Sequence, residues 1–371
     1  MLLIQKFLLE NYENWEEVLN SKGIKVKRKD NLAILSYNLN EAIENGIKLD
    51  FADPIVKECR GIIVDTMDNF RVVCYPFSKF GNYTESYADD IDWSTAKVQE
   101  KLDGSLIKLY FYDGKWRWAT NGMIDANDAM ASNGETFYEL IQKAVNINDL
   151  DYNRLSTNCT YMFELVSPYN RVVVRYDYPM LYHIGTRNNV YGNEFWQYVG
   201  VVQPKEYKLS SLDDCIVYAE LLNPKGICEH EGFVVVDRNY HRVKVKSIAY
   251  LTLHKSIDNH GITDERAIEI IQQKMTEQYY SFPREYAKLK EFEYKISTLR
   301  RDLFEYLVFA INLWEEYEHE KKAFALQIKD DKFKDFAFNI IKQPECDVLE
   351  FVDNWLKNSK PRDILKRLNY V

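Results

Sequence analysis

The amino-acid sequence predicts an α+β fold, with antiparallel sheets and flanking helices over residues 1–250 and an all-α domain over residues 251–371. Two observations carry this prediction. Up to about residue 250, short runs of alternating apolar and polar residues recur between turn-forming residues, a pattern typical of antiparallel strands. From about Leu251 onward, the apolar residues recur instead at the spacing of amphipathic helices. The length of 371 residues is sufficient for two or three domains with separate cores.

The predicted strands begin with residues 24–29 and 31–38, which Asp30 and Asn31 would join as a hairpin. Residues 60–77 read as two apolar strands with a turn at residues 67–69. Residues 105–120 form the clearest hairpin, because Asp113 and Gly114 separate two alternating runs. Further strands are expected at residues 160–166, 171–176, 180–187, 231–237 and 241–247.

The predicted helices lie at both ends of the chain and once between strands. Residues 1–19 are apolar at helical spacing and predict an amphipathic surface helix. A helix is expected over residues 126–145, with an interruption near Gly134. In the C-terminal region, Thr263 is a candidate N-cap, residues 283–322 predict one long helix or two stacked ones, and two short helices follow a break at Gln343.

Composition and charge exclude few classes of protein. The net charge of −9 gives no sign of nucleic-acid binding, so any such site must concentrate positive charge locally. No apolar run is long enough to cross a bilayer, and we expect no membrane partner. Six cysteines without a C-x-x-C spacing argue against structural zinc or a disulfide framework and suit the reducing cytoplasm. Cys228 and His230 alone supply too few ligands for zinc.

Lys101 is the candidate nucleophile. It precedes a predicted strand in the stretch Lys101-Leu102-Asp103-Gly104-Ser105, where Asp103 and Gly104 predict a turn. A lysine that is partly desolvated beside other cations is shifted toward the neutral amine, which is its nucleophilic form. Gly104 would let the backbone approach a ligand closely. A Lys-x-Asp-Gly surface turn is common by chance, so the motif gains weight only from other residues.

Charged residues in apolar, strand-like surroundings supply that support. Glu164 and Glu231 are carboxylates that need a cation, a metal or a donor if they are buried. Lys244 and Lys246 alternate, so they share one strand face and would repel each other unless an anion such as a triphosphate lies between them. Two further cations suited to phosphate are Arg60 and Lys79.

Each of these residues also has a structural explanation. Glu164 could form an ion pair with Arg171, and Arg60 could pair with Glu58. Lys244 and Lys246 could be a solvated strand face, and Glu231 a charge on an edge strand. The joint occurrence of all of them, in order along a β-rich body, favours a common site.

In this order, the residues resemble the covalent nucleotidyltransferase superfamily of ligases and capping enzymes, and within it the phage-type RNA ligase 1 family, which repairs tRNA. The resemblance covers roughly residues 30–255. It is carried by Lys101-x-Asp103-Gly104, Glu164, Glu231-Gly232 and Lys244-x-Lys246, with additional matches at Ser36-Tyr37-Asn38, Glu58-Cys59-Arg60-Gly61, Lys79-Phe80, residues 163–171, Ser247 and Tyr250.

The resemblance implies an ATP-dependent RNA ligase with a nucleotidyltransferase domain at residues 1–250 and a helical domain at 251–371 that selects RNA. Lys101 would attack the α-phosphate of ATP, AMP would pass to an RNA 5′-phosphate, and a 3′-hydroxyl would displace it. By the resemblance, ATP would contact Tyr37, Arg60, Lys79, Glu164, Glu231, Gly232, Lys244 and Lys246, with Asp103, Gly104 and Tyr250 in support. Glu231 is also the candidate metal ligand.

The implied cofactors are ATP and Mg²⁺, with Mn²⁺ as an alternative. The implied partners are RNA ends, such as cleaved tRNA, and a separate end-healing kinase/phosphatase, in the cytoplasm of a cell or of a viral host. The chain departs from the family's pattern at Asn121, where a lysine is usual, so phosphate or RNA-end contacts are less secure there.

Two other classes of protein remain open. A DNA ligase or capping enzyme shares the lysine chemistry, but it usually continues into a small β-barrel, and the helical pattern after Leu251 disfavours this. A non-catalytic RNA-binding relative would keep the fold without turnover. The basic pairs Arg300-Arg301 and Lys321-Lys322 could meet RNA or could be solvated helix faces.

Overall fold

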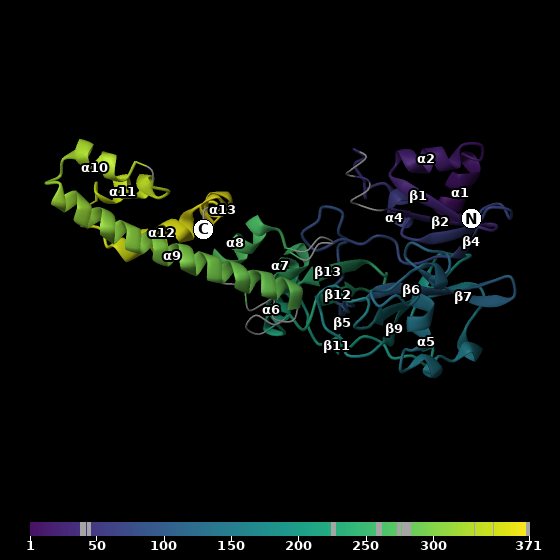
Figure 1. Cartoon of the computed structure of the whole chain (residues 1–371). Coiled ribbons are helices and arrows are strands. Elements are labelled where there is room, and N and C mark those ends of the chain that lie inside the picture. The colour runs from purple at the N-terminus through teal and green to yellow at the C-terminus, as the bar shows by residue number, and fades with distance from the viewer. Residues whose placement is uncertain are drawn as a thin grey trace. The chain divides into compact units, whose positions relative to one another are not determined.

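The computed structural model describes residues 1–37, 42, 46–223, 228–256, 262–272, 276, 283–329, 331–343 and 345–368. These residues form two compact units, one up to Leu251 and one from Thr252, and the boundary falls within α7 (Ile248–Ser256). The first unit contains three antiparallel sheets with helices, and the second contains helices (Figure 1). The predicted α+β fold with a helical C-terminal region is confirmed.

The first sheet has the order β1-β2-β3-β4. Its strands are β1 (Ile24–Lys29), β2 (Leu32–Tyr37), β3 (Ile62–Asp65) and β4 (Arg71–Cys74). Asp30 takes a φ of 53° at the predicted hairpin turn between β1 and β2. Three helices share a buried apolar cluster with this sheet: α1 (Leu3–Glu10), α2 (Trp15–Ser21) and α4 (Pro54–Glu58).

The prediction of one continuous helix over residues 1–19 is wrong, because two separate helices, α1 and α2, form there. The Asn11 side-chain amide donates to the carbonyl of Phe7 at 2.8 Å, and Asn14 donates its backbone N–H to Asn11. These local bonds satisfy the end of α1 and close a turn before α2 begins.

The second sheet has the order β10-β9-β8-β6-β7 and packs against the first. Its strands are β6 (Ser105–Tyr112), β7 (Lys115–Thr120), β8 (Cys159–Val166), β9 (Met180–Asn188) and β10 (Glu194–Phe195). The predicted Asp113-Gly114 turn joins β6 to β7, with φ of 51° and 72°. Between the first two sheets, Cys74 and Ile63 meet Tyr110 and Ala119 in one buried apolar cluster.

The helix predicted for residues 126–145 is much shorter than expected. Only a 3₁₀ turn at Ala126–Asp128 and α5 (Phe137–Gln142) are helical there. The Asp125 side chain caps the 3₁₀ turn, and Thr136 and Glu139 form a capping box that starts α5. These polar residues bond to nearby backbone groups and so divide the segment. Two more 3₁₀ turns follow, at Ile147–Asp149 and Tyr152–Arg154.

The third sheet has the order β11-β5-β12-β13. Its strands are β11 (Glu206–Tyr207), β5 (Lys97–Glu100), β12 (Gly232–Val236) and β13 (Arg242–Lys246), and α6 (Leu212–Leu221) packs on it. Along β13, the buried residues Val243 and Val245 alternate with Lys244 and Lys246, which are half-buried on the opposite face. This alternation leaves one face of the sheet for the apolar core and the other for a site.

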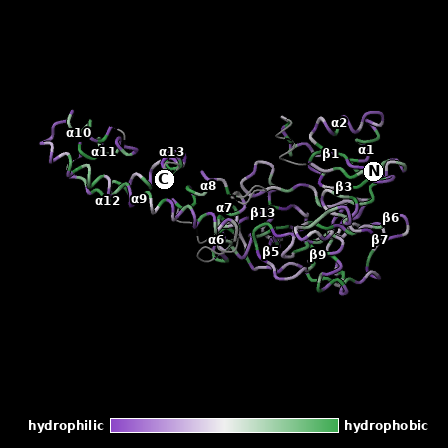
Figure 2. Tube along the Cα trace, in the orientation of Figure 1, coloured by the Kyte–Doolittle hydropathy of each residue, from purple (hydrophilic) through white to green (hydrophobic). Residues whose placement is uncertain are grey.

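The second unit contains helices of very different length. They are α8 (Asp264–Gln272), α9 (Pro283–Glu316), α10 (Lys321–Gln327), α11 (Lys334–Ile340), α12 (Val348–Asn358) and α13 (Pro361–Leu368). The long helix is therefore one element, and the two short helices predicted after Gln343 are present. Apolar and polar residues alternate along α9 and α12 (Figure 2). Among the described residues, no helix has the length and apolar content needed to span a membrane.

Candidate active site

A pocket of about 320 Å³ lies in the first unit, where β5, β6, β8 and β13 converge. Its lining contains six of the predicted site residues: Arg60, Lys101, Gly104, Glu164, Lys244 and Lys246. These residues lie as far as 186 positions apart in the sequence, from Arg60 to Lys246. The sequence order of charged residues thus corresponds to one cavity in the fold.

Lys101 is held at the end of β5 by both backbone and side-chain contacts. Its N–H donates to the carbonyl of Gly232 at 2.8 Å. Its Nζ lies 2.8 Å from Oε2 of Glu231, and the other oxygen of Glu231 lies 2.8 Å from Nζ of Lys246. Glu231 is only 2 % exposed, so one buried carboxylate bridges two lysines at the pocket.

The charge state of Lys101 differs from the prediction. Burial alone lowers the pKa of its amine, but the carboxylates of Glu231 and Glu164 outweigh burial and place the pKa above its usual value. The sequence predicted that neighbouring cations would lower this pKa, and that prediction is wrong. The physical reason is the Glu231 carboxylate in direct contact, because an opposite charge at 2.8 Å outweighs like charges farther away.

The lysine with a strongly lowered pKa is Lys244. Burial, with the like charges of Lys79 and Arg60 next in effect, lowers its pKa to about 6. Its Nζ donates to the Phe80 carbonyl at 3.0 Å and lies 4.5 Å from the centre of the Phe80 ring. Lys244 and Lys246 share one face of β13, as predicted from their alternation. Among the described residues, Lys244 forms no ion pair with a carboxylate, so this cation at the pocket suits an anionic ligand.

Glu164 lies on β8 and faces the same cavity. Its Oε1 accepts the N–H of Gly104 at 3.1 Å. Burial raises the pKa of this carboxyl to about 7, although the charge of Lys101 opposes the shift. The alternative partner considered for it, Arg171, donates its Nε to the Val173 carbonyl.

Asp103 fastens the loop that was predicted to be a strand at residues 171–176. Its Oδ2 accepts the N–H groups of Val173 and Val174 at 2.6 and 2.7 Å, and its Oδ1 accepts the Tyr250 hydroxyl at 2.8 Å. The strand prediction is wrong, because a buried carboxylate takes the N–H groups that a sheet ladder would need. Asp103 and Tyr250 are therefore supports behind the pocket.

Four predicted ATP contacts lie outside the lining of this pocket: Glu231 and Gly232, which contact Lys101, and Tyr37 and Lys79. Lys79 stacks over Phe51, with its Nζ 4.9 Å from the ring centre, and lies 5.9 Å from the Tyr37 ring. Burial lowers the pKa of Lys79 and raises that of Tyr37 to about 12. Asn38, matched with Tyr37 in the same motif, lies outside the described residues.

Arg60 has a buried side-chain nitrogen that is available to an anionic ligand. Its Nη1 is buried without a hydrogen-bond partner among the described residues. The partner considered for it in the sequence, Glu58, instead accepts the Tyr75 hydroxyl at 2.8 Å and the N–H of Ile4 at 3.3 Å. An orphaned guanidinium nitrogen at a cavity wall fits a phosphate oxygen.

Several lining residues escaped prediction from the sequence. Phe77, Phe80, Gln99, Glu100 and Arg242 all line the cavity. Phe80 belongs to the Lys79-Phe80 match but had no role assigned to it, whereas the others carry no local signal. Glu100 is also the partner of His230, one of the two residues considered above as zinc ligands. Its Oε1 lies 2.9 Å from Nδ1 of His230.

The described residues contain no group of three His, Cys, Asp or Glu side chains that could hold a metal ion. Both oxygens of Glu231 contact lysines, so its role as a metal ligand remains a prediction.

Comparison with known proteins adds independent information. The profile of a family described as RNA ligase matches residues 58–251, more than half of the chain. A putative bifunctional polynucleotide kinase/RNA ligase of Autographa californica nuclear polyhedrosis virus is 33% identical over 63% of this chain and 35% of its own length. An RNA ligase of Rhodothermus phage RM378 is 27% identical over 90% of this chain and 91% of its own length. The chain thus spans about a third of the baculovirus relative and most of the phage one.

Among solved structures, an archaeal ATP-dependent RNA ligase is 12% identical, with a TM-score of 0.41 over 77% of this chain and 78% of that one. An RNA ligase of Naegleria gruberi determined with AMP and Mn is 15% identical, with a TM-score of 0.32 over 43% and 52% of the two chains.

Proposed function

Because this chain belongs to the RNA ligase family, we propose that it is an ATP-dependent enzyme that joins 5′-phosphate and 3′-hydroxyl RNA ends through AMP bound covalently to Lys101. The observation that carries the proposal is the position of Lys101. Its amine lies in a pocket with Arg60, Lys244 and Lys246, where an ATP phosphate chain would be neutralised.

In the first step, Nζ of Lys101 attacks the α-phosphorus of ATP, a P–N bond forms, and the bond to pyrophosphate breaks. The amine reacts only when neutral, so the Lys101–Glu231 pair must first release its proton. In the second step, AMP moves to the 5′-phosphate of RNA and Lys101 is freed. In the third, a 3′-hydroxyl attacks that phosphate and AMP leaves.

The proposed ATP contacts are those predicted from the sequence. Arg60, Lys244 and Lys246 face the pocket and suit the phosphates, and Glu164 suits the ribose because a carboxyl can hydrogen-bond to its hydroxyls. Lys79 and Tyr37 would act beside them. Mg²⁺ or Mn²⁺ would enter with ATP, since phosphate oxygens and water can provide most of its ligands.

A labelling experiment tests the proposal directly. Incubation with α-³²P-ATP and Mg²⁺ should label the wild-type protein, and Lys101→Ala should abolish the label. Lys115→Ala, which alters an exposed lysine in the β6–β7 hairpin, should label as wild type does. A wild-type protein that binds ATP but takes no label would identify a non-catalytic relative instead.

RNA, not DNA, is the proposed substrate. Within the described part of residues 252–371 there are helices and no strand, so a β-barrel of the kind that follows the lysine domain in DNA ligases and capping enzymes has no support there. Labelled enzyme should seal 5′-phosphorylated single-stranded RNA. Efficient sealing of nicked duplex DNA would overturn the choice of substrate.

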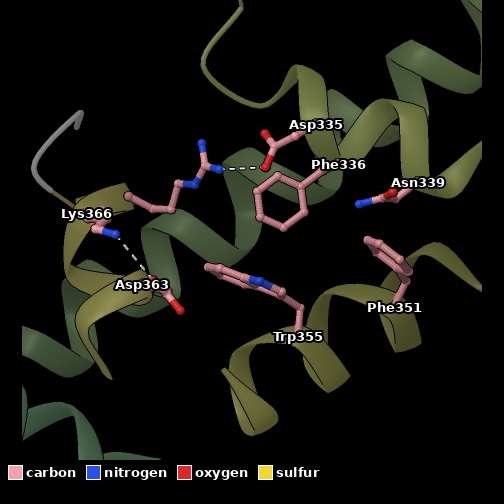
Figure 3. A pocket seen from close by; sticks show the side chains of 8 residues that line it. Asp335, Phe336, Asn339, Phe351, Trp355, Asp363 and Lys366 are labelled. Atoms are coloured by element: carbon pink, nitrogen blue, oxygen red, sulfur yellow. Dashed lines mark hydrogen bonds and ion pairs between the residues drawn. The ribbon is translucent and has the colours of Figure 1, made fainter. Parts of the chain in front are cut away.

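We propose further that the helical unit selects the RNA. A cavity of about 730 Å³ lies among α11, α12 and α13, and Phe336, Phe351 and Trp355 present aromatic rings to it, with Asn339 at its edge (Figure 3). Arg367 lies beside them and pairs with Asp335 at 2.6 Å. Aromatic faces with a nearby guanidinium suit an unpaired nucleotide.

Trp355→Ala should weaken binding of single-stranded RNA, measured by fluorescence anisotropy, while labelling by ATP stays at the wild-type level. A matched control is Trp314→Ala, since Trp314 packs in a separate cluster of the same unit. Unchanged RNA affinity in Trp355→Ala would remove this cavity from the proposal. The basic pair Arg300-Arg301 offers less support, because both residues already contact aspartates, Asp353 and Asp302.

The biological setting is also a proposal. We propose that the substrate is broken RNA such as cleaved tRNA, and that a separate kinase/phosphatase prepares its ends. The name of the Autographa californica virus relative pairs a polynucleotide kinase with an RNA ligase in that protein. The cytoplasm is the proposed location, and the six free cysteines suit a reducing compartment. Sealing assays with tRNA cut in the anticodon loop, before and after end healing, would test this setting.

A further inference from the structure

Lys108 is a fully buried lysine directly behind the proposed ATP pocket. It lies on β6, is 0% exposed, and belongs to the face of the strand that also carries Leu106 and Tyr110. Leu106 packs in the apolar cluster at the pocket, and Tyr110 packs in the cluster between the first two sheets. An ammonium group thus occupies a position where an apolar side chain would be the stabilising choice.

The Lys108 ammonium is directed at the loops that form one wall of the pocket. Its Nζ donates a short hydrogen bond to the carbonyl of Gly61. Gly61 has a φ of +84°, and a methyl carbon added there would lie 2.9 Å from Nζ of Lys108 and 2.5 Å from the carbonyl oxygen of Asn121. The Lys108 side chain, the backbone after Arg60 and the Asn121 loop therefore meet at one crowded point.

Within the part of the chain that the structure describes, Lys108 forms no ion pair with a carboxylate. The titratable and charged groups that face it are Cys74 of β4 and Arg60. On the flanking strands β7 and β8, the paired residues are Ala119 and Met162. Burial raises the pKa of the Cys74 thiol, so that thiol is neutral near pH 8.

Burial, reinforced by the charge of Arg60, lowers the pKa of Lys108 to about 8. Its neighbour Arg60 carries the orphaned Nη1 at the cavity wall. The charges of Lys108, which is fully buried, and Arg60, which is half-buried, repel each other, and an anion that enters the pocket beside Arg60 would offset this repulsion.

We propose that Lys108 is a positioning residue for ATP: it anchors the Arg60–Gly61 backbone and the Asn121 loop, and its charge joins that of Arg60 in attracting the phosphates. This inference rests on the proposed use of ATP at the pocket. It assigns a role to a residue that does not line the cavity and acts through Arg60. It also places a buried cation near Asn121, the uncharged residue that stands where the family usually has a lysine.

The test uses Lys108→Met, which keeps the length of the side chain and removes the charge, and Lys108→Arg, which keeps the charge. Tyr110→Phe is the matched control, since it removes a buried hydrogen bond from the same strand face to the carbonyl of Ile124, 3.1 Å away. The rate of Lys101 labelling is measured against ATP concentration from pH 6 to pH 9.5. Proton uptake is measured by calorimetry of AMP binding at pH 8 in buffers of different ionisation enthalpy.

Lys108→Met should lower the labelling efficiency at limiting ATP by about 10- to 100-fold, since small displacements of positioning groups have effects of this size. The pH dependence of Lys101 itself is common to all the variants, so each efficiency is divided by that of Lys108→Met. The wild-type ratio should decline above pH 8 as Lys108 loses its proton, and the decline for Lys108→Arg should lie at higher pH. When it binds AMP, the wild-type protein should take up a fraction of a proton. Lys108→Met should lack this part of the proton uptake. Tyr110→Phe should follow the wild type in both measurements.

Equal pH profiles and equal proton uptake in wild type and Lys108→Met would overturn the inference, whatever the loss of activity, because a merely structural lysine would affect stability alone. If Lys108→Arg does not fold, the comparison of wild type with Lys108→Met decides the question. Failure of the wild-type protein to bind AMP would refute the proposed function itself. AMP binding that does not depend on Lys108 would refute only the inference about Lys108.

Discussion

Nζ of Lys101 and Oε2 of Glu231 lie 2.8 Å apart, although the two residues are separated by 130 positions in the sequence. Because Glu231 also contacts Lys246 at 2.8 Å, one carboxylate holds two lysines of the site in place. The contact keeps Lys101 protonated and oriented before ATP arrives. We therefore expect the reactivity of Lys101 to depend on separation of its amine from the Glu231 carboxylate.

Glu231→Gln should lower the free energy of unfolding at pH 7 by about 3 kcal/mol, because Lys101 and Lys246 would remain buried without a counter-ion. The pKa of Glu231 is lowered in the folded protein by the two lysines, against the opposing effect of burial. Its contribution is thus present above the unfolded pKa and lost as pH falls through the folded value. Urea unfolding should show the full difference at pH 7, and the difference should shrink progressively as the pH is lowered below about 4.5.

A matched control for this substitution is Glu206→Gln. Glu206 pairs with Lys97 at 3.5 Å with both side chains about half exposed, so its loss should cost less than about 0.5 kcal/mol. Equal effects of the two substitutions at pH 7 would contradict a special role for the Glu231 bridge.

Glu164→Gln should change the pH dependence of stability. The carboxyl pKa is raised to about 7 by burial, so the folded protein binds its proton more tightly than the unfolded chain does. The resulting stabilisation is fully present below the unfolded pKa of about 4.5 and is lost as pH rises through about 7. Relative to the variant, wild type should lose about 3 kcal/mol over this range in urea unfolding. Parallel stability curves would show that Glu164 does not titrate in this way.

Asp103→Ala should free the loop at Val173 and Val174, because it removes the carboxylate oxygen that accepts both backbone N–H groups. The expected loss is about 2–3 kcal/mol, against about 1 kcal/mol for Tyr250→Phe, which removes one hydroxyl from the same carboxylate. Hydrogen exchange at the two amides should accelerate in Asp103→Ala. Unchanged exchange there would refute the fastening role.

Gly104→Ala should disrupt the site, because an added methyl carbon would overlap the carbonyl oxygen of Leu165. The adjustment would move the backbone beside Lys101 and Glu164, and we expect a loss of about 100-fold or more in the labelling rate. Gly122→Ala is the control, since an added carbon there meets nothing within 4 Å. Normal labelling of Gly104→Ala would show that the close backbone contact is not required.

Local patterns in the sequence predicted most of the strands of the three sheets. The β1–β2 and β6–β7 hairpins were predicted correctly, because alternation and turn residues such as Asp113 act within a few positions. The predictions failed for residues 126–145 and 171–176, where side-chain bonds from Thr136 and from Asp103 override local propensity. Asp103 lies 70 residues from the loop it fastens, and such a contact leaves no trace in either segment alone.

The chemical groups of the site and their order along the chain can be read from the amino-acid sequence, since the motifs around Lys101, Glu164 and Lys244 are local. The charge states of these groups depend on the folded structure. Contact with Glu231 raises the pKa of Lys101, while burial among cations lowers that of Lys244 to about 6. The structure also revealed Lys108 behind the pocket, a residue with no motif of its own. A pKa depends on burial and on distances between charges, and both exist only after distant segments have packed together.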